Sequence, residues 1–329
     1  MQSYWIQSST GQTTLERREA PLPEPAAGQV LVRMRAAGLN RGEFIAGHGL
    51  TKPGAAKPAG GEGAGEIFKL GAGVTGLAPG ARVMGRCGGA FAEYALMDAR
   101  EAVAIPARLS WEEAASIPLT FMVVHDMLIA QGRLAAGEWL LVTGISSGVG
   151  VATLQTGKAL GAKVIGTSGS ADKLERLKAA GLDLGIRTRA GDFCEAVITA
   201  TGGKGANLAV NNVGGSVFAE CVRALAFQGR LATVGYVDGA LKAEMDIEAL
   251  HAKRLTLFGV SNKLRSPEQR AESAHGFVAD ILPMIADGRI RPLIDRAYDF
   301  DQLPAAKAYM ESNAHLGKIV LRIQESGAT

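Results

Sequence analysis

Short apolar runs separated by turns rich in glycine and proline fill the first 110 or so residues. Val30, Val32 and Met34 alternate with the residues between them, which is the period of a β-strand with two different faces. The turn Leu-Ala-Pro-Gly at 77–80 separates two such runs, and 47–65 is rich in glycine and proline without any period. We therefore predict a β-rich N-terminal region with a loop at 47–65.

The pattern changes near residue 112. Residues 112–136 have helical periodicity, and short β runs then alternate with amphipathic segments. The predicted strands are 139–143, 163–167, 184–187, 208–212, 230–235 and 255–260. The predicted helices are 149–160, 171–180, 192–200, 216–227 and part of 242–252. Six strands with helices between them are the pattern of a doubly wound parallel sheet.

The end of the chain, from 268 to 329, predicts one or two helices and then a strand at 318–323. A lone terminal strand must pair somewhere, and the β-rich N-terminal region is its natural partner. The length of 329 residues is about twice the ~150-residue prior for one domain. We therefore expect an α/β protein with a β-rich domain (1–120 and 266–329) and a second domain that contains the doubly wound sheet (121–265).

Composition and charge exclude several classes of protein. Hydrophobic residues make up 47% of the chain and charged residues 20%, which is ordinary globular composition. The net charge of +3 gives no argument for binding nucleic acid or an anionic membrane. Three scattered cysteines form no disulfide framework, and we see neither a signal peptide nor an apolar run of about 18 residues. We expect a soluble, cytoplasmic protein.

The most specific local motif is the glycine turn in WLLVTGISSGVGVATL, which follows the first strand of the predicted α/β domain. Glycines at such a turn let a pyrophosphate approach the backbone N–H groups of a helix N-terminus. The spacing differs from G-x-G-x-x-G, and a generic strand-to-helix turn is the alternative. The candidate cofactor-binding residues of this turn are Gly144, Ser146, Ser147, Gly148, Val149 and Gly150.

The end of the second predicted strand bears on the choice between NAD and NADP. An NAD site places Asp or Glu there to hold the ribose 2′-hydroxyl, about 20 residues after the glycine turn. This chain has Ser168 instead, and Asp172 falls in the next helix, where it can simply cap that helix. Lys173 and Arg187 are nearby cations that suit a 2′-phosphate, although each can also be a solvated surface residue. NADPH is the favoured cofactor.

A series of motifs along nearly the whole chain resembles the medium-chain dehydrogenase/reductase superfamily, in particular its zinc-free quinone oxidoreductase branch with the zeta-crystallins. The motifs are AAGLNRGEF (36–44), GGEGAGEI (60–67), GGAFAEYALM (88–97), AASIPLTFMVVHDML (114–128), NNVGG (211–215), GRLATVG (229–235) and HLGKIVL (315–321). The resemblance implies a Rossmann-type domain and a GroES-like substrate domain. It also implies further cofactor contacts, for which our candidates are Asn212, Gly235, Phe258, Val260 and Lys318.

The zinc-dependent members of the superfamily have a cysteine where this chain has Asn40 and a histidine where it has Gly61, just before Glu62. Neither ligand is present, and the four-cysteine structural zinc lobe is also missing. We therefore expect no metal.

By resemblance, Asn40 and His125 lie near the nicotinamide and are our catalytic candidates. Asn40 could donate a hydrogen bond to a developing oxyanion, or it could only brace a turn. His125 could donate a proton or merely fill space on a helix face. Related enoyl-thioester reductases use a tyrosine in the loop at 47–53, where Thr51 is the best match in this chain.

Together these features predict an NADPH-dependent, zinc-independent oxidoreductase that transfers a hydride to a quinone or an α,β-unsaturated carbonyl compound. One alternative is a reductase for one particular enone or enoyl thioester. Another is an NADPH-binding protein with little turnover. We expect a small-molecule substrate, no nucleic-acid or membrane partner, and a homodimer that forms through the sixth strand of the α/β domain, 255–260.

Overall fold

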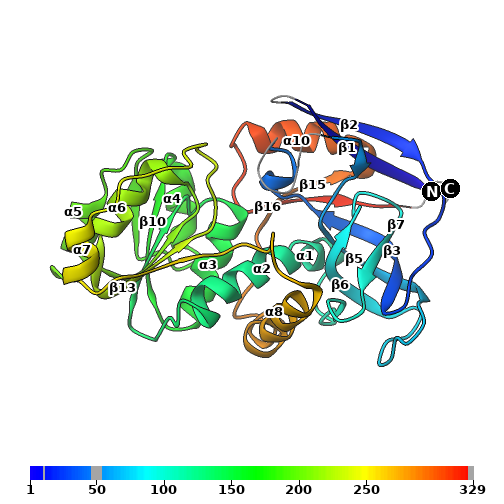
Figure 1. Cartoon of the computed structure of the whole chain (residues 1–329), viewed down its shortest axis with the longest axis horizontal. Helices are drawn as coiled ribbons and strands as arrows, with labels where there is room; N and C mark the ends of the chain where they lie inside the picture. Colours follow the sequence, from blue (N-terminus) through cyan, green and yellow to red (C-terminus); the bar gives the residue numbers. More distant parts are fainter. Residues whose placement is uncertain (10–11, 46–53, 325–329) are drawn as a thin grey trace. The chain divides into compact units, whose positions relative to one another are not determined.

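The computed structural model describes residues 1–9, 12–45 and 54–324 (Figure 1). The chain divides into two compact units. The first comprises Met1–Thr120, Lys263–Val278 and Pro292–Thr329, and the second comprises Phe121–Asn262 and Ala279–Arg291. The stretch 279–291 groups with the second unit, whereas the sequence-based division placed all of 266–329 in the first domain.

The first unit consists mainly of antiparallel strands. Its larger sheet has the order β15-β16-β3-β5-β6-β7, and β8 pairs with β6. Because β3 also pairs with β7, the strands β3, β5, β6 and β7 close into a ring, which protects strand edges from association. A smaller sheet has the order β2-β1-β4. The bounds are β1 Gln2–Ser9, β2 Gln12–Glu19, β3 Gln29–Gly38, β4 Lys57–Pro58, β5 Glu62–Leu70, β6 Arg82–Gly88, β7 Tyr94–Asp98, β8 Val103–Ala104, β15 Ile294–Asp299 and β16 Lys318–Arg322.

Strand β3 is more deeply buried than its alternating sequence suggests. Val30, Leu31 and Val32 are all fully buried, because the ring encloses one face of β3 and helix α1 (Trp111–Ala115) packs against the strand as well. The apolar core of this unit also takes in Leu303, Ala306 and Met310 of helix α10 (Leu303–Glu311).

The C-terminal strand returns to the β-rich unit, as predicted. Strand β16 pairs antiparallel with β3, with Val320 opposite Gly38. On its other side β16 pairs in parallel with β15, which the sequence pattern did not reveal. This placement fixes Lys318, the first residue of β16, beside the end of β3.

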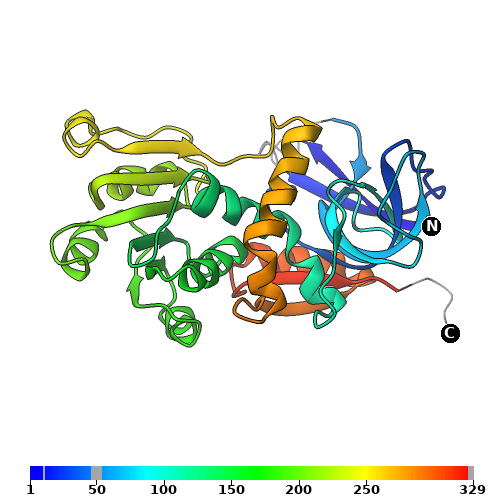
Figure 2. The same cartoon turned by 90° about the horizontal axis from the view of Figure 1, so that it is seen from below.

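The second unit contains a six-stranded parallel sheet in the order β11-β10-β9-β12-β13-β14 (Figure 1). The strands run along the chain as 3-2-1-4-5-6, so the order reverses between β9 and β12, where doubly wound sheets bind ligands. The predicted doubly wound sheet is confirmed. The strands are β9 Trp139–Thr143, β10 Lys163–Ser168, β11 Leu184–Arg187, β12 Ala206–Asn211, β13 Leu225–Thr233 and β14 Thr256–Gly259; Figure 2 shows β14, in yellow, at the outer edge. The helices between them are α3 Gly148–Ala159, α4 Ala171–Lys178, α5 Cys194–Ala200, α6 Phe218–Arg223 and α7 Ile247–Ala252.

The continuous helix expected over 112–136 is wrong. The structure has α1, then α2 (Pro118–His125), then a π-helical turn, η2 (Asp126–Ala130). Pro118 lacks an N–H and restricts the residue before it, so the first helix ends before α2 begins. No helix in the described part of the chain is long and apolar enough to cross a membrane.

Two other predicted boundaries need correction. The segment 47–65 was expected to be a loop, but β4 and the start of β5 fall inside it. The helix expected over 216–227 consists of the short turn η3 (Gly215–Val217) and α6, and β13 already begins at Leu225. In both places, pairing with neighbouring strands overrides the local sequence preference.

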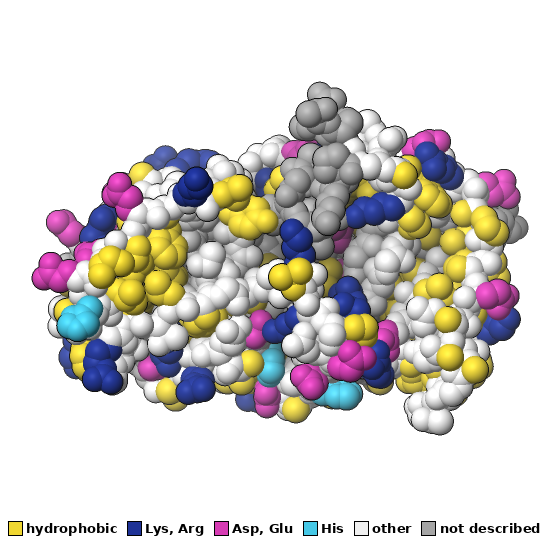
Figure 3. All heavy atoms as spheres, in the orientation of Figure 1, with side chains coloured by type: hydrophobic (Ala, Val, Ile, Leu, Met, Phe, Trp, Pro, Cys, Tyr) yellow, Lys and Arg dark blue, Asp and Glu magenta, His cyan; other side chains and the backbone are white. Residues whose placement is uncertain are grey.

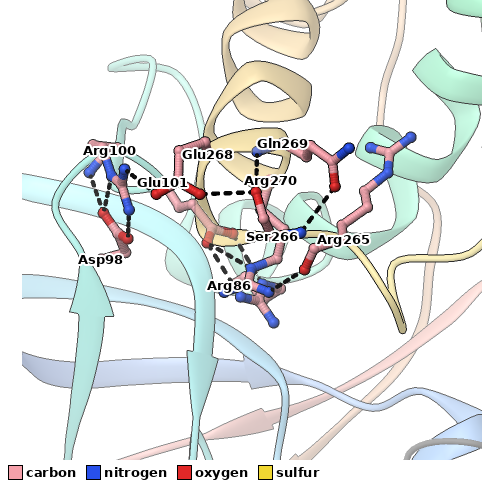
Figure 4. A network of polar contacts seen from close by, with 9 residues as sticks. All are labelled: Arg86, Asp98, Arg100, Glu101, Arg265, Ser266, Glu268, Gln269 and Arg270. Atoms are coloured by element: carbon pink, nitrogen blue, oxygen red, sulfur yellow. Dashed lines mark hydrogen bonds and ion pairs between the residues drawn. The ribbon is translucent and has the colours of Figure 1, made fainter.

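Helix α8 (Pro267–Asp280) begins at a network of charged side chains (Figure 4). The carboxylate of Glu101 is almost fully buried and accepts two hydrogen bonds from Arg86, at 2.9 and 3.1 Å. The Nε of Arg270, in the first turns of α8, lies 3.4 Å from the same carboxylate. The Glu101 carboxylate therefore anchors α8 to the strands of the first unit. The remaining helices are α9 (Leu282–Ala286), η1 (Arg41–Glu43) and η4 (Phe300–Gln302).

Candidate functional site

The glycine turn connects β9 to α3 in a tight bend. Gly144 follows the strand with φ of +62°, a left-handed conformation that favours glycine. Ser147 caps the helix, because its Oγ accepts a hydrogen bond from the N–H of Gly150 at 3.0 Å. The N–H groups of Gly148 and Val149 belong to the first helical turn, whose amides have no partner within the helix.

Gly150 is required at its position by close packing. A Cβ there would lie 2.6 Å from both the Cα and the carbonyl oxygen of Ile145. The helix can therefore approach the strand closely only because this residue has no side chain. The structure thus brings all six predicted residues of the turn together at the carboxyl end of β9 and the N-terminus of α3, the kind of position at which helix amides can receive an anion.

The carboxyl end of β10 carries no acidic side chain. Ser168 ends the strand, and its Oγ lies 3.4 Å from the Oγ of Ser146 in the glycine turn. Asp172 does not cap helix α4, because Ser170 occupies the N-cap position. Asp172 is exposed and lies 4.0 Å from Arg176 on the same helix. The end of β10 therefore holds Ser168 and no acidic residue, and the expectation that Asp172 can cap helix α4 is wrong.

Three cationic residues belong to the elements that adjoin this end of β10. Arg187 is paired directly with Ser168 across the parallel ladder, and Lys173 lies in the first turn of α4. Arg189 was missed in the sequence analysis. Its side chain lies across Gly169, so closely that a Cβ on Gly169 would overlap it. The only signal in the sequence was its position two residues after Arg187.

Of the other predicted cofactor residues in this unit, Asn212 and Gly235 lie close to β9, and Phe258 and Val260 lie farther along the sheet. Asn212 follows β12, the neighbour of β9, and its Nδ2 donates to the carbonyl oxygen of Thr143 at 3.0 Å. A Cβ on Gly235 would lie 3.6 Å from the carbonyl oxygen of Asn212, so these two residues are adjacent. Phe258 and Val260 belong to the β14 region, which β12 and β13 separate from the glycine turn.

Lys318 lies elsewhere, in a buried polar cluster of the first unit. Its ammonium donates to the carbonyl oxygen of Leu39 at 3.0 Å, to Asn40 Oδ1 at 2.9 Å and to Glu62 Oε1 at 2.7 Å. A lysine has three donor hydrogens, and these three acceptors use them all. The structure therefore places Lys318 with Asn40 in the first unit, whereas the glycine turn belongs to the second.

The amide of Asn40 is also engaged inside this cluster. Its Nδ2 donates to Glu62 Oε1 at 2.9 Å and to Glu43 Oε1 at 3.2 Å. The second oxygen of Glu62 accepts the backbone N–H of Leu119 at 2.7 Å. Both amide hydrogens of Asn40 thus have partners, so a hydrogen bond to a substrate oxygen would require one of them to be released.

Glu43 was also missed, although it stands only three residues after Asn40. Burial, with a smaller contribution from the nearby carboxylate of Glu62, raises the pKa of the Glu43 carboxyl to about 7. Gly61 makes room for this carboxyl, because a Cβ at position 61 would lie 2.7 Å from Glu43 Oε1.

Among the described residues, no group of three or more His, Cys, Asp or Glu side chains is arranged to hold a metal ion.

His125 ends α2 in the second unit, whereas Asn40 belongs to the first. The Nε2 of His125 lies 2.8 Å from Asp280 Oδ2, so this ring has a structural partner at the end of α8. The π-helical turn η2 follows it at once, and such turns are frequent at functional sites. Thr51 lies outside the described residues.

Comparisons with known proteins agree with this arrangement. Residues 26–107 match the family described as "Alcohol dehydrogenase GroES-like domain", and 148–276 match "Zinc-binding dehydrogenase". The chain is 33% identical over 310 residues to the spectinabilin polyketide synthase system protein NorB of Streptomyces orinoci. This alignment covers 92% of the chain but only 14% of NorB.

Solved structures cover the whole fold. Mycobacterial Rv1454c complexed with NADPH superposes with a TM-score of 0.88 at 26% identity, covering 98% of this chain and 100% of that one. The quinone oxidoreductase of Escherichia coli complexed with NADPH gives a TM-score of 0.85, also at 26% identity, with the same coverage. The β-rich unit, the doubly wound sheet and the family and structure matches all indicate the same family. The chain belongs to the medium-chain dehydrogenase/reductase family of oxidoreductases.

Proposed function

We propose that this protein is an NADPH-dependent oxidoreductase that reduces quinones or α,β-unsaturated carbonyl compounds without a metal. The observation that carries the proposal is the carboxyl end of β10, where Ser168 stands in place of the ribose-binding acid. Lys173 lies in the first turn of the next helix, Arg187 is paired with Ser168 on the neighbouring strand, and the Arg189 side chain lies against Gly169. A carboxylate there would repel a 2′-phosphate, whereas arginine and lysine bind it through charge-assisted hydrogen bonds.

The glycine turn supports the same cofactor. The first-turn amides of α3 suit a pyrophosphate, and the close approach at Gly150 keeps the strand and the helix together beneath it. Two similar solved proteins are complexed with NADPH, which supports the nucleotide at this site.

NADPH, when bound, supplies a hydride from C4 of its nicotinamide and is left as NADP⁺. In an enone, the hydride forms the new bond to the β-carbon, the C=C electrons form the enolate double bond to the carbonyl carbon, and the C=O π electrons move onto the oxygen. A proton from solvent then completes the saturated product. For such electron-poor acceptors the chain's main contribution is to position the reactants and to stabilise the charge that develops on oxygen.

A second candidate is the reduction of an enoyl thioester. The similarity to the polyketide synthase protein NorB favours it, although the chain spans only 14% of that relative. The chemistry is the same hydride addition to a β-carbon, and only the group attached to the carbonyl differs. A third candidate, NADPH binding with little turnover, predicts cofactor binding without acceptor reduction.

We also propose a homodimer that pairs through β14. This strand is at the edge of its sheet, and an uncovered edge invites pairing with another chain. Figure 3 shows hydrophobic atoms gathered over the α7 end of this unit. The exposed large apolar side chains of the unit include Phe227, Leu241, Ile247 and Leu257, and Leu257 lies on β14 itself. A twofold pairing of β14 would cover the edge of both copies.

The test is a titration with NADPH and NADH, followed by turnover with a small quinone, a simple enone and an enoyl thioester. We expect NADPH to bind at least about tenfold more tightly than NADH, because each lost charge-assisted contact costs about 1.5 kcal/mol or more. A preference for NADH would reject the proposal that the end of β10 binds the 2′-phosphate of NADPH. Tight NADPH binding without oxidation by any acceptor would favour the third candidate.

A further inference from the structure

The buried cluster of the first unit has a fully buried part and a part formed by less buried residues. Lys318 and Glu62 form the fully buried part, since their side chains are 7% and 0% exposed and every donor hydrogen of the ammonium has an acceptor. Asn40 and Glu43 are the partly exposed residues of the cluster. The carboxyl of Glu43 is itself buried, so the cluster comes nearest to the surface at Asn40.

The two hydrogen bonds of the Asn40 amide differ in length. The bond to Glu62 is 2.9 Å long, and its acceptor is held in place by Lys318 and by the N–H of Leu119. The bond to Glu43 is 3.2 Å long, at the upper end of the range for N–H···O hydrogen bonds. The hydrogen that points to Glu43 is therefore the one that can be released most easily.

The charged and titratable groups that face Glu43 within the described residues come from three strands. They are Glu62 on β5, Cys87 on β6 and Lys318 on β16. Arg41, on the same element as Glu43, is directed elsewhere, because its guanidinium donates to Met310 and Asn313. Burial and Glu62 both favour the neutral carboxyl, and together they outweigh Lys318 and the amide of Asn40.

We propose that Glu43 is a positioning residue for the hydride acceptor, and that a proton on its carboxyl sets whether Asn40 can donate its second amide hydrogen to the acceptor's oxygen. This inference rests on the proposed function. A neutral carboxyl is a weaker acceptor than a carboxylate, so the Asn40 hydrogen is released more easily while Glu43 is protonated.

Net charge acts in the same direction. With Glu43 neutral, Glu62 and Lys318 cancel and the cluster carries no net charge. Ionised Glu43 adds one buried negative charge beside the amide, which opposes a second negative charge on an acceptor oxygen. Because the pKa of Glu43 is raised to about 7, the competent form is present below neutral pH and is lost as the pH rises through about 7.

The test is the pH profile of kcat/KM for NADPH-dependent reduction of an enone, in the wild type and in Glu43→Gln. Glutamine keeps the shape of the side chain but cannot ionise. About one pH unit above neutrality we expect the wild type to have lost up to roughly tenfold in kcat/KM, and the variant to have lost less than about twofold. Glu24→Gln, a matched change at an exposed glutamate, should keep the wild-type profile.

Infrared spectroscopy gives a readout that requires no turnover. The wild type should show a protonated-carboxyl band that disappears as the pH rises through about 7, and this band should be missing in Glu43→Gln but present in Glu24→Gln. A wild-type profile that is flat across the neutral range overturns the inference, even if the variant fails to fold. So does a fall in activity that persists unchanged in Glu43→Gln.

The failure of the proposed function has a different signature. If the wild type reduces neither quinones nor enones, the proposed function is rejected and the role of Glu43 falls with it. If turnover occurs but its pH profile does not depend on Glu43, only the role of Glu43 is rejected.

Discussion

The ammonium of Lys318 lies 2.7 Å from the carboxylate of Glu62, and both side chains are buried. Each ion therefore depends on the other for its solvation, since water cannot reach either group. The pair also fixes Asn40, because the Asn40 amide accepts a hydrogen bond from Lys318 and donates one to Glu62.

Replacement of Lys318 by methionine should destabilise the first unit strongly. The substitution leaves the Glu62 carboxylate buried without its cation, which typically costs about 3–5 kcal/mol. Lys69→Met is the matched control, because Lys69 forms an exposed pair with Glu24 and such pairs contribute about 1 kcal/mol or less. Denaturant unfolding measures both. Equal losses of unfolding free energy in the two variants would mean that the buried Lys318–Glu62 pair contributes no more than an exposed pair.

Glu43 should make the stability of the protein depend on pH. Its pKa in the folded protein, about 7, lies above the ordinary value of 4.5, so the stability it contributes is fully present below about 4.5 and is lost as the pH rises to about 7. Glu43→Gln removes this dependence. Its stability should exceed that of the wild type by an increasing amount over this pH range, up to roughly 3 kcal/mol. Parallel stability curves for the two proteins would contradict this prediction.

Arg189 should control the choice of cofactor. Replacement by alanine removes a cation from the end of β10, and we expect NADPH affinity to fall about tenfold while NADH affinity stays nearly unchanged. Lys204→Ala, at an exposed lysine in the turn after α5, should change neither affinity. Calorimetric titration with both nucleotides distinguishes these outcomes. An equal loss for NADPH and NADH would instead indicate a general disturbance of the site.

Gly150→Ala should weaken both stability and cofactor binding. Its Cβ would lie 2.6 Å from the backbone of Ile145, so the helix or the turn must shift, at a cost of about 1–3 kcal/mol. Gly88→Ala is the control, because a Cβ there meets no heavy atom within 4 Å. Thermal unfolding with and without NADPH tests the pair. If the Gly150→Ala protein binds NADPH as tightly as the wild type, the proposal that this turn binds the pyrophosphate is rejected.

Leu257→Lys should convert the proposed dimer into a monomer. The substitution places a charge on the edge strand β14, and lysine on an edge strand opposes pairing with another chain. Glu24→Gln, which changes an exposed residue of the other unit, is the control and should leave the mass unchanged. Light scattering after size-exclusion chromatography gives the mass. A wild type that is already monomeric would reject the dimer.

The doubly wound sheet was readable from the sequence because each of its strands is a short apolar run with its own turn signals. The strand predicted at 139–143 agrees exactly with β9, and that at 184–187 agrees with β11. Strand β15 was missed because its residues are half-buried and mostly polar, so that only its pairing with β16 defines it. The prediction of one helix over 112–136 was wrong because Pro118 begins a new helix there, although the apolar periodicity continues across it.

The candidate site was predictable only in part, for a physical reason. The glycine turn is local in sequence, so its geometry follows from a few adjacent residues. The cluster around Asn40 joins residues from β5 and β16 that are 256 positions apart, and no sequence period links Glu62 to Lys318. Glu43 and Arg189 acquire their significance from burial and from packing across Gly169, and neither property can be read from one chain position.

The most direct test of the account follows the hydride itself. The protein is incubated with an enone and NADPH carrying deuterium on either face of C4, and the product is analysed by mass spectrometry and NMR. We predict that deuterium from one face only is transferred to the β-carbon of the saturated product, with one NADP⁺ formed for each product molecule. An enone that remains unreduced, or a product without deuterium from either cofactor, would contradict the proposed hydride transfer.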